Sequence, residues 1–148
     1  MTFLVAVDGS DASDNALEYA TDLAAKLDVG LLVVQAVEPA VVDIGGDEPT
    51  GFDDAAGRLV AEAVEDAEGQ AMEVLEAAEA HAQAAGVDVE TELLYGPPIQ
   101  TIADVTDRAD VTALFVGHRG LSRRYEGLVG SVAKGLVERS RVPVTVVR

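Results

Sequence analysis

Short apolar runs alternate along the chain with segments whose apolar residues recur at helical spacing. Buried strands are predicted where valine and leucine cluster, over residues 3–7, 31–37, 111–116 and 142–147. Helices are predicted where apolar residues repeat every three or four positions, over residues 10–27, 59–85, 99–109 and 131–140. Strands that alternate with helical crossovers indicate an α/β domain with a parallel sheet and helices on both faces.

One further strand is predicted over residues 87–95, where apolar and acidic residues alternate. One face carries Val87, Val89, Thr91, Leu93 and Tyr95, and acidic residues face the other way. A strand with one polar face is half-buried, so we expect it at an edge of the sheet.

The ends of the first two helices have recognisable signals. Ser10 or Asp11 can cap the first helix, and Gly30 is expected to serve its C-terminal turn. Residues 39–57 are rich in Gly, Asp and Pro, which predicts a long mobile loop before the second helix. We expect residues 1–148 to form a single domain.

Three glycines and a serine follow the strand at 111–116. They are Gly117, Gly120, Gly130 and Ser131, a spacing that fits neither the P-loop nor the GxGxxG fingerprint. They lie at a strand-to-helix turn, where backbone amides and the positive end of a helix can face an anion.

This spacing resembles the G-x2-G-x9-G-[ST] ATP-binding signature of the universal stress protein family at all its fixed positions. Residues 5–10 (VAVDGS) and 140–147 (SRVPVTVV) resemble the first and last strands of the same family. The resemblance implies a five-stranded, flavodoxin-like or Rossmann-like sheet of order 3-2-1-4-5, with the third strand at an edge. Ligands of such sheets bind at the carboxyl ends of the strands, here beside Asp8 and Gly117.

The resemblance also assigns residues to a nucleotide site. Ala6 corresponds to a position lining the adenine pocket, Ala36 to one whose backbone contacts the adenine edge, and Val116 is expected near the base. Asp8 is similar to the acid that contacts the nucleotide or its metal, and Mg²⁺ between carboxylate and phosphates would make this favourable. The alternative for Asp8 is an aspartate that bonds its own turn.

The phosphates are expected at the glycine loop. Gly117 and Gly120 would let the backbone approach them, whereas Gly130, Ser131 and Val132 would donate hydrogen bonds. Ser131 is also compatible with a plain helix cap. Arg119 is a candidate phosphate partner, as are Arg123 and Arg124. His118 fits a phosphate contact and a loop surface equally well.

The chain is strongly acidic, and its charges are unevenly distributed along the sequence. The net charge is −17, the pI is near 4.2 and only two residues are lysine, which together indicate a halophilic acidic protein and argue against nucleic acid as a partner. Residues 1–116 hold 3 basic and 25 acidic residues, whereas residues 117–148 hold 7 basic and 2 acidic ones. This surplus of basic residues favours phosphate binding near the glycine loop. The alternative explanation is a basic dimer interface.

Other chemistry is poorly represented. The chain has no cysteine, and we expect no protein-bound metal other than Mg²⁺ carried by ATP phosphates. The sequence has no stretch of 18 consecutive apolar residues, so we expect no membrane partner. A cytoplasmic location is compatible with this. We find no residue pattern for a catalytic site, so whether the chain is an enzyme stays open, with slow ATP hydrolysis the most that is indicated.

The last strand predicts a homodimer. Residues 142–147 are apolar on both faces, which makes an exposed edge prone to pairing. The resemblance implies antiparallel pairing with a second copy, and a covering tail or loop is the alternative.

We therefore expect a dimeric stress-response module that binds ATP or AMP. The alternatives are a dimer of the same type without nucleotide, and a slow ATP hydrolase or phosphotransferase.

Overall fold

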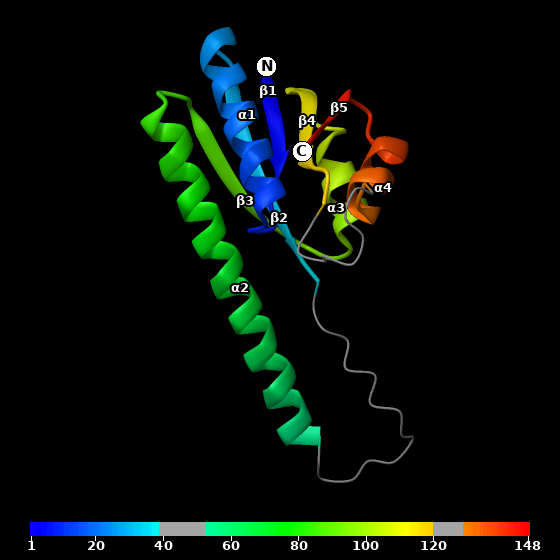
Figure 1. Ribbon diagram of the computed structural model, residues 1–148. Coiled ribbons are helices and arrows are strands. Elements are labelled where there is room, and N and C mark those ends of the chain that lie inside the picture. Colours follow the sequence, from blue (N-terminus) through cyan, green and yellow to red (C-terminus); the bar gives the residue numbers. More distant parts are fainter. Residues whose placement is uncertain (39–52, 120–128) are drawn as a thin grey trace.

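The computed structural model describes residues 1–38, 53–119 and 129–148, in which strands and helices alternate (Figure 1). The elements are β1 (Thr2–Ala6), α1 (Asp11–Leu27), β2 (Gly30–Val37), α2 (Asp53–Ala84), β3 (Val89–Tyr95), α3 (Pro98–Val105), β4 (Val111–Gly117), α4 (Ser131–Arg139) and β5 (Val144–Val147).

The strands form one parallel sheet in the order β3-β2-β1-β4-β5. The predicted fold class is confirmed, and β3 lies at an edge as its polar face indicated. The central strand β1 pairs Ala6 with Val34 on one side and with Val116 on the other. The switch in strand order therefore falls between β1 and β4, as in other doubly wound sheets.

Two cores lie on opposite faces of the sheet. Helices α1 and α2 cover one face, and α3 and α4 cover the other (Figure 1). Along β1, Phe3, Val5 and Val7 belong to the first core, whereas Leu4 and Ala6 belong to the second. This division follows from the two-residue period of a strand, which sends successive side chains to opposite faces.

The start of α1 agrees with the sequence, and its end does not. Ser10 is the N-cap and its side chain accepts a hydrogen bond from the Ser13 amide. The prediction that Gly30 serves the C-terminal turn is wrong, because Asp28 adopts the left-handed conformation there with φ 54°. Aspartate tolerates that conformation better than most residues, so Gly30 is free to open β2.

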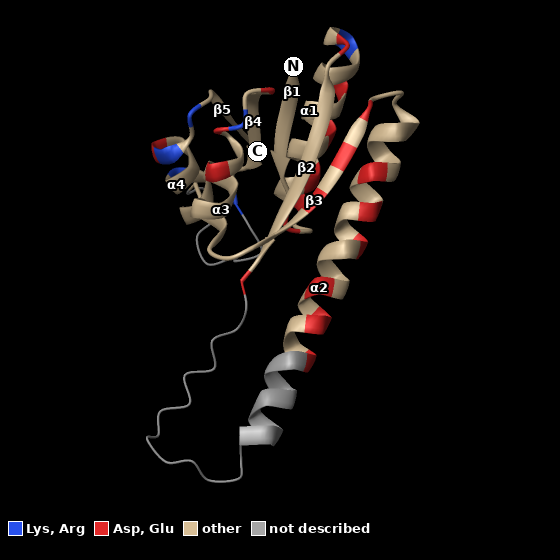
Figure 2. Ribbon diagram, turned by 180° about the vertical axis from the view of Figure 1, so that it is seen from behind, with Lys and Arg blue, Asp and Glu red and all other residues tan. Residues whose placement is uncertain are grey.

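Helix α2 begins earlier than its apolar stripe predicted. Residues 53–57, predicted as the end of a loop, are helical, and residues 39–52 of that loop lie outside the described residues. Among the side chains of α2 that are described, residues 62–84, the buried ones include Ala71, Leu75, Ala78 and Ala82. Acidic residues line the exposed side of α2 and parts of β3 (Figure 2).

The prediction of one apolar face on β3 is only partly right. Val89 and Leu93 pack against the α1–α2 core, but Thr91 is exposed and so is Tyr95. Leu94, on the face assigned to acidic residues, is buried in the α3–α4 core. The reason is tertiary, since α3 follows β3 directly and covers the end of its other face.

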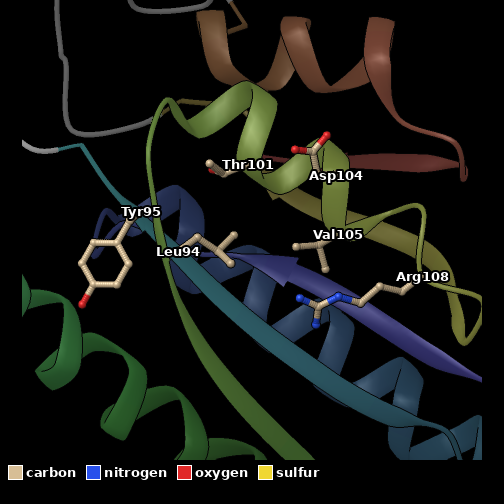
Figure 3. Close-up of a pocket in the computed structure, with 6 residues that line it drawn as sticks. All are labelled: Leu94, Tyr95, Thr101, Asp104, Val105 and Arg108. Carbon is tan, nitrogen blue, oxygen red and sulfur yellow. The ribbon is translucent and has the colours of Figure 1, made fainter.

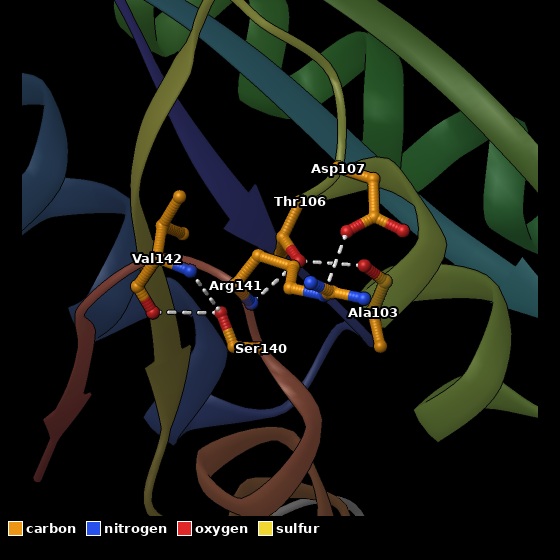
Figure 4. A network of polar contacts seen from close by, with 6 residues as sticks. All are labelled: Ala103, Thr106, Asp107, Ser140, Arg141 and Val142. Atoms are coloured by element: carbon orange, nitrogen blue, oxygen red, sulfur yellow. Dashed lines mark hydrogen bonds and ion pairs between the residues drawn. The ribbon is translucent and has the colours of Figure 1, made fainter.

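A buried threonine joins the end of α3 to the segment before β5 (Figure 4). Helix α3 ends at Val105 instead of near residue 109, and Thr106 is its C-cap. The Thr106 hydroxyl donates to the Ala103 carbonyl at 2.6 Å and accepts from the Arg141 amide at 3.1 Å. An exposed ion pair between Arg141 Nε and Asp107 Oδ1, 3.3 Å long, lies beside it.

We predict that Thr106→Val destabilises the fold by about 1–3 kcal/mol, because it leaves the Arg141 amide without its acceptor. Thr112→Val is the matched control, since the Thr112 hydroxyl makes only a long 3.4 Å bond to the Thr2 carbonyl. Urea unfolding of both variants measures the difference. Equal stabilities would show that the Thr106 bonds do not hold β5 in place.

Candidate functional site

Two turns that are far apart in the sequence meet at the carboxyl ends of β1 and β4. The turn after β1 carries Asp8 and Ser10, and the segment after β4 carries Arg119. The Ser10 hydroxyl donates to the Arg119 carbonyl at 3.5 Å. The structure therefore brings together the two segments that the sequence placed at one crevice.

The turn after β1 is stabilised by its own polar groups. Asp8 Oδ1 accepts a hydrogen bond from the Ser10 amide at 2.9 Å, and Ser13 Oγ accepts one from the Asp8 amide at 3.2 Å. Ser10 and Ser13 are both buried. Asp8 thus has the turn-forming role weighed as the alternative, with one carboxylate oxygen engaged in this way. Sequence reasoning missed Ser13, because the turn pattern of aspartate predicts only the bond from the Ser10 amide to Asp8 and not the bond from the Asp8 amide to Ser13.

Gly117 has a packing role that the sequence analysis did not predict. A Cβ at this position would come within 2.7–2.8 Å of the backbone of Ala12 and Ser13 in α1. Real Cβ atoms do not approach backbone atoms so closely. Gly117 is therefore required for the contact between β4 and the first turn of α1, and this packing accounts for it without a phosphate. Gly120 lies outside the described residues.

The backbone of His118 closes the base of the glycine loop. The His118 amide donates to the Val147 carbonyl at 2.7 Å, and the His118 carbonyl accepts from the Gly130 amide at 2.6 Å. Arg119 Nε donates to His118 Nε2 at 2.9 Å, so these two neighbouring side chains are paired with each other.

This closure changes which amides can bind an anion. The Gly130 amide is already bonded to His118, and Gly130 acts as the N-cap of α4 without a side-chain hydrogen bond. The first bond of α4 that returns to its cap runs from the Lys134 amide to the Gly130 carbonyl. Among the predicted donors, the amides of Ser131 and Val132 are the ones that the helix start leaves for a ligand.

The residues predicted around the base share one face of the sheet. Ala6 and Val116 are each 6% exposed and pair directly in the sheet, and Ala36 packs against the same core. All three lie in the α3–α4 core, the face that α4 covers. A flat apolar group at their carboxyl ends would therefore lie beside the N-terminus of α4.

Basic residues lie on the side of the sheet that carries α4 and β5, with Arg139 and Arg141 at the end of α4 away from Ser131. Lysine and arginine lie on α4 and around β5, whereas acidic residues dominate α2 and occur along β3 (Figure 2). The predicted basic surplus is thus located on the α4 side, although Arg123 and Arg124 lie outside the described residues. In the described residues, no group of three or more His, Asp or Glu side chains is placed to hold a metal.

A hollow of about 240 Å³ lies between β3 and α3 (Figure 3). Arg108 lines it, and its guanidinium makes two hydrogen bonds of 2.7 and 2.8 Å to Glu92. These bonds hold the pKa of the Glu92 carboxyl below its ordinary value, despite an opposing effect of burial. Because Glu92 already engages this guanidinium, the hollow is a weaker candidate for an anion than the crevice at α4.

Comparison with known proteins identifies relatives of the whole chain. The model of the universal stress protein family matches residues 1–148. The universal stress protein YxiE of Bacillus subtilis is 32% identical over 145 residues, which cover 98% of this chain and 97% of that protein. Several mycobacterial universal stress proteins are longer, and the matching region covers 46–47% of each.

Solved structures of universal stress proteins have folds similar to that of this chain. A universal stress protein UspA from Lactobacillus plantarum superposes with a TM-score of 0.84 at 22% identity, covering 100% of this chain and 97% of that one. A universal stress protein solved in complex with cAMP is 29% identical (TM-score 0.67, 100% and 97% covered). One from Archaeoglobus fulgidus solved with dAMP is 25% identical (TM-score 0.66, 100% and 98% covered).

None of the helices in the described ranges combines the length and hydrophobicity needed to cross a bilayer.

We predict that Gly117→Ala destabilises the protein by about 1–3 kcal/mol, because the added methyl group meets rigid backbone of α1. Gly69→Ala is the control, since an added Cβ there has no neighbour within 4 Å and alanine favours a helix by about 1 kcal/mol. Urea unfolding should place the two variants on opposite sides of the parent. A Gly117→Ala protein as stable as the parent would exclude the packing role.

Proposed function

Because the chain belongs to the universal stress protein family, we propose that it is a regulatory module that binds ATP or AMP in the crevice between β1 and β4. The adenine lies against Ala6, Ala36 and Val116, and the phosphates face the N-terminus of α4. The complexes of relatives with cAMP and dAMP support an adenine nucleotide as the ligand class.

The observation that carries this proposal is the hydrogen bonding at the start of α4. The Gly130 amide is bonded within the loop, but the first turn of α4 has no side-chain cap. A helix start without such a cap favours an anion. Phosphate oxygens would accept from the Ser131 amide, the Ser131 hydroxyl and the Val132 amide.

Magnesium enters this proposal through Asp8. One Asp8 oxygen is bonded to the Ser10 amide, and no hydrogen bond between described residues engages the other carboxylate oxygen. Mg²⁺ is commonly held by one or two carboxylates together with substrate phosphates, so a single carboxylate at this turn fits an ion that arrives with ATP. The ion would supply charge neutralisation between the carboxylate and the phosphates.

The acidic surface suggests where the protein works. Acidic residues outnumber basic ones by 27 to 10. In molar salt the Debye length falls to about 3 Å, which mutes repulsion between such charges. We propose a cytoplasmic protein of a salt-accumulating cell, in which backbone hydrogen bonds contribute more to nucleotide binding than exposed arginines.

We predict that Ser131→Pro weakens ATP binding about tenfold or more, because it removes an amide donor and a hydroxyl donor together. Proline suits the first position of a helix, and Pro98 already occupies that position in α3, so the fold should persist. Titration calorimetry with ATP and AMP, with and without Mg²⁺, measures the change.

Ser131→Ala separates the two donors, since it removes the hydroxyl and keeps the amide, and its loss should be smaller. Full ATP affinity in a folded Ser131→Pro protein would move the phosphates away from α4. A parent protein that binds neither nucleotide would favour the family-type dimer without nucleotide, and release of ADP would favour the hydrolase.

We also propose a homodimer that pairs through the outer edge of β5. The Leu114 amide donates to the Pro143 carbonyl, and the His118 amide donates to the Val147 carbonyl. The carbonyls of Pro143 and Val147 therefore point toward β4. By strand alternation, the Val144 and Val146 amides point to the free edge. An apolar free edge of this kind favours pairing with a second copy.

We predict that Val146→Pro converts a dimer to a monomer, because it removes an outward amide and leaves the bonds to β4 in place. Light scattering after size exclusion in high salt measures the mass, and circular dichroism checks the fold. A parent protein that is monomeric, or a variant that stays dimeric, would contradict pairing at this edge.

A further inference from the structure

A groove lies between α1 and α2, on the face of the sheet opposite α3 and α4. Helix α1 packs mainly on β1, β4 and β5, whereas α2 packs on β2 and β3, and the space between the helices is only partly filled. The groove has a volume of about 650 Å³. Small-molecule sites commonly measure about 300–1,000 Å³, so the groove is large enough for a compact organic ligand.

The floor of the groove is apolar. Val7 directly after β1, Leu17 on α1 and Ala78 on α2 are buried, and Val74 is partly buried beside them. Ala77 adds an exposed methyl group at the side. Val7, Leu17, Val74 and Ala78 belong to or pack against one core, which fixes the floor of the groove.

The rim of the groove is acidic. Asp14 and Glu18 lie four residues apart on α1, and Glu73 faces them from α2. Gln70 and His81 complete the polar lining, which includes no lysine or arginine. The ion pairs between described residues involve none of these carboxylates.

The carboxylates on α1 are in an unfavourable arrangement. Like charges four residues apart destabilise a helix, which applies to Asp14 and Glu18. Burial raises the pKa of the Asp14 carboxyl above its ordinary value, and Asp11 and Asp8 raise it further, against the lowering effect of His81. A cation in the groove would offset this repulsion.

We propose that the groove binds a small organic cation with an apolar body. The charged head lies between Asp14, Glu18 and Glu73, and the apolar body packs on Val7, Leu17 and Val74. The cavity selects for shape and the carboxylates select for charge. A bare metal ion fits less well, because no three of the described acidic or histidine side chains are placed to coordinate one.

The probe for the test is 4-phenylbutylammonium, compared with 4-phenylbutanol and 4-phenylbutanoate, which keep the apolar body and change the charge. The protein carries labelled Val and Leu methyl groups and is studied by NMR at the lowest KCl concentration that keeps it folded, without nucleotide. The cation should shift the methyl resonances of Val7, Leu17 and Val74. The methyls of Leu4 and Val34, on the other face of the sheet, serve as internal controls.

The charge requirement is tested by single substitutions at exposed positions. Glu18→Gln and Glu73→Gln should each weaken binding of the cation about two- to fivefold. Glu76→Gln, which makes the same charge change on exposed α2 surface outside the groove, should change it less than twofold. Ala77→Phe should block the groove and remove the methyl shifts.

The proposal is supported if the cation binds tighter than the alcohol and the alcohol tighter than the carboxylate. It is overturned if the three probes bind equally, if Glu76→Gln acts like Glu73→Gln, or if the groove methyls do not move. Because no nucleotide is present, either result leaves the proposed nucleotide site to be judged by its own titration.

Discussion

The contact between Gly117 and the first turn of α1 is the constraint on which the arrangement of this molecule depends. It joins the end of β4 to the backbone of Ala12 and Ser13, at a distance that admits no side chain at position 117. The contact brings the turn after β1 and the loop after β4 side by side, where Ser10 reaches the Arg119 carbonyl. The two segments assigned to the nucleotide site are therefore adjacent at the switch in strand order, and packing alone is a sufficient reason for a glycine at position 117.

Around this contact, the hydrogen bonds within the protein decide which backbone amides of the proposed nucleotide site remain for a ligand. The loop is closed by the Gly130 amide, and β5 is tied to the loop through the His118 amide and the Val147 carbonyl. The start of α4 is left without a side-chain cap. The same strand end thus belongs both to the proposed nucleotide site and to the edge through which we propose that two copies pair. A ligand at α4 and a partner at β5 would act on neighbouring bonds of one loop.

The two faces of the sheet differ in chemistry because their helices differ in packing. On the α3–α4 side, the helices pack against each other, the Thr106 bonds hold the segment before β5, and the hollow between β3 and α3 is small. On the α1–α2 side, the helices stand apart and leave a groove with an apolar floor and an acidic rim. The charge of the chain follows the same division, with basic residues near α4 and acidic residues along α2 (Figure 2).

The sequence by itself determined what depends on neighbours along the chain. Apolar periodicity located the strands and helices, the Ser10 cap located the start of α1, and the resemblance carried by the glycine spacing implied the strand order that the sheet has. Only the tertiary structure decided that Gly117 packs against α1, that the Gly130 amide is bonded to His118, that Leu94 is buried and that α1 and α2 enclose a groove. These features depend on how closely backbones distant in sequence approach each other. No local pattern of residue types encodes that distance.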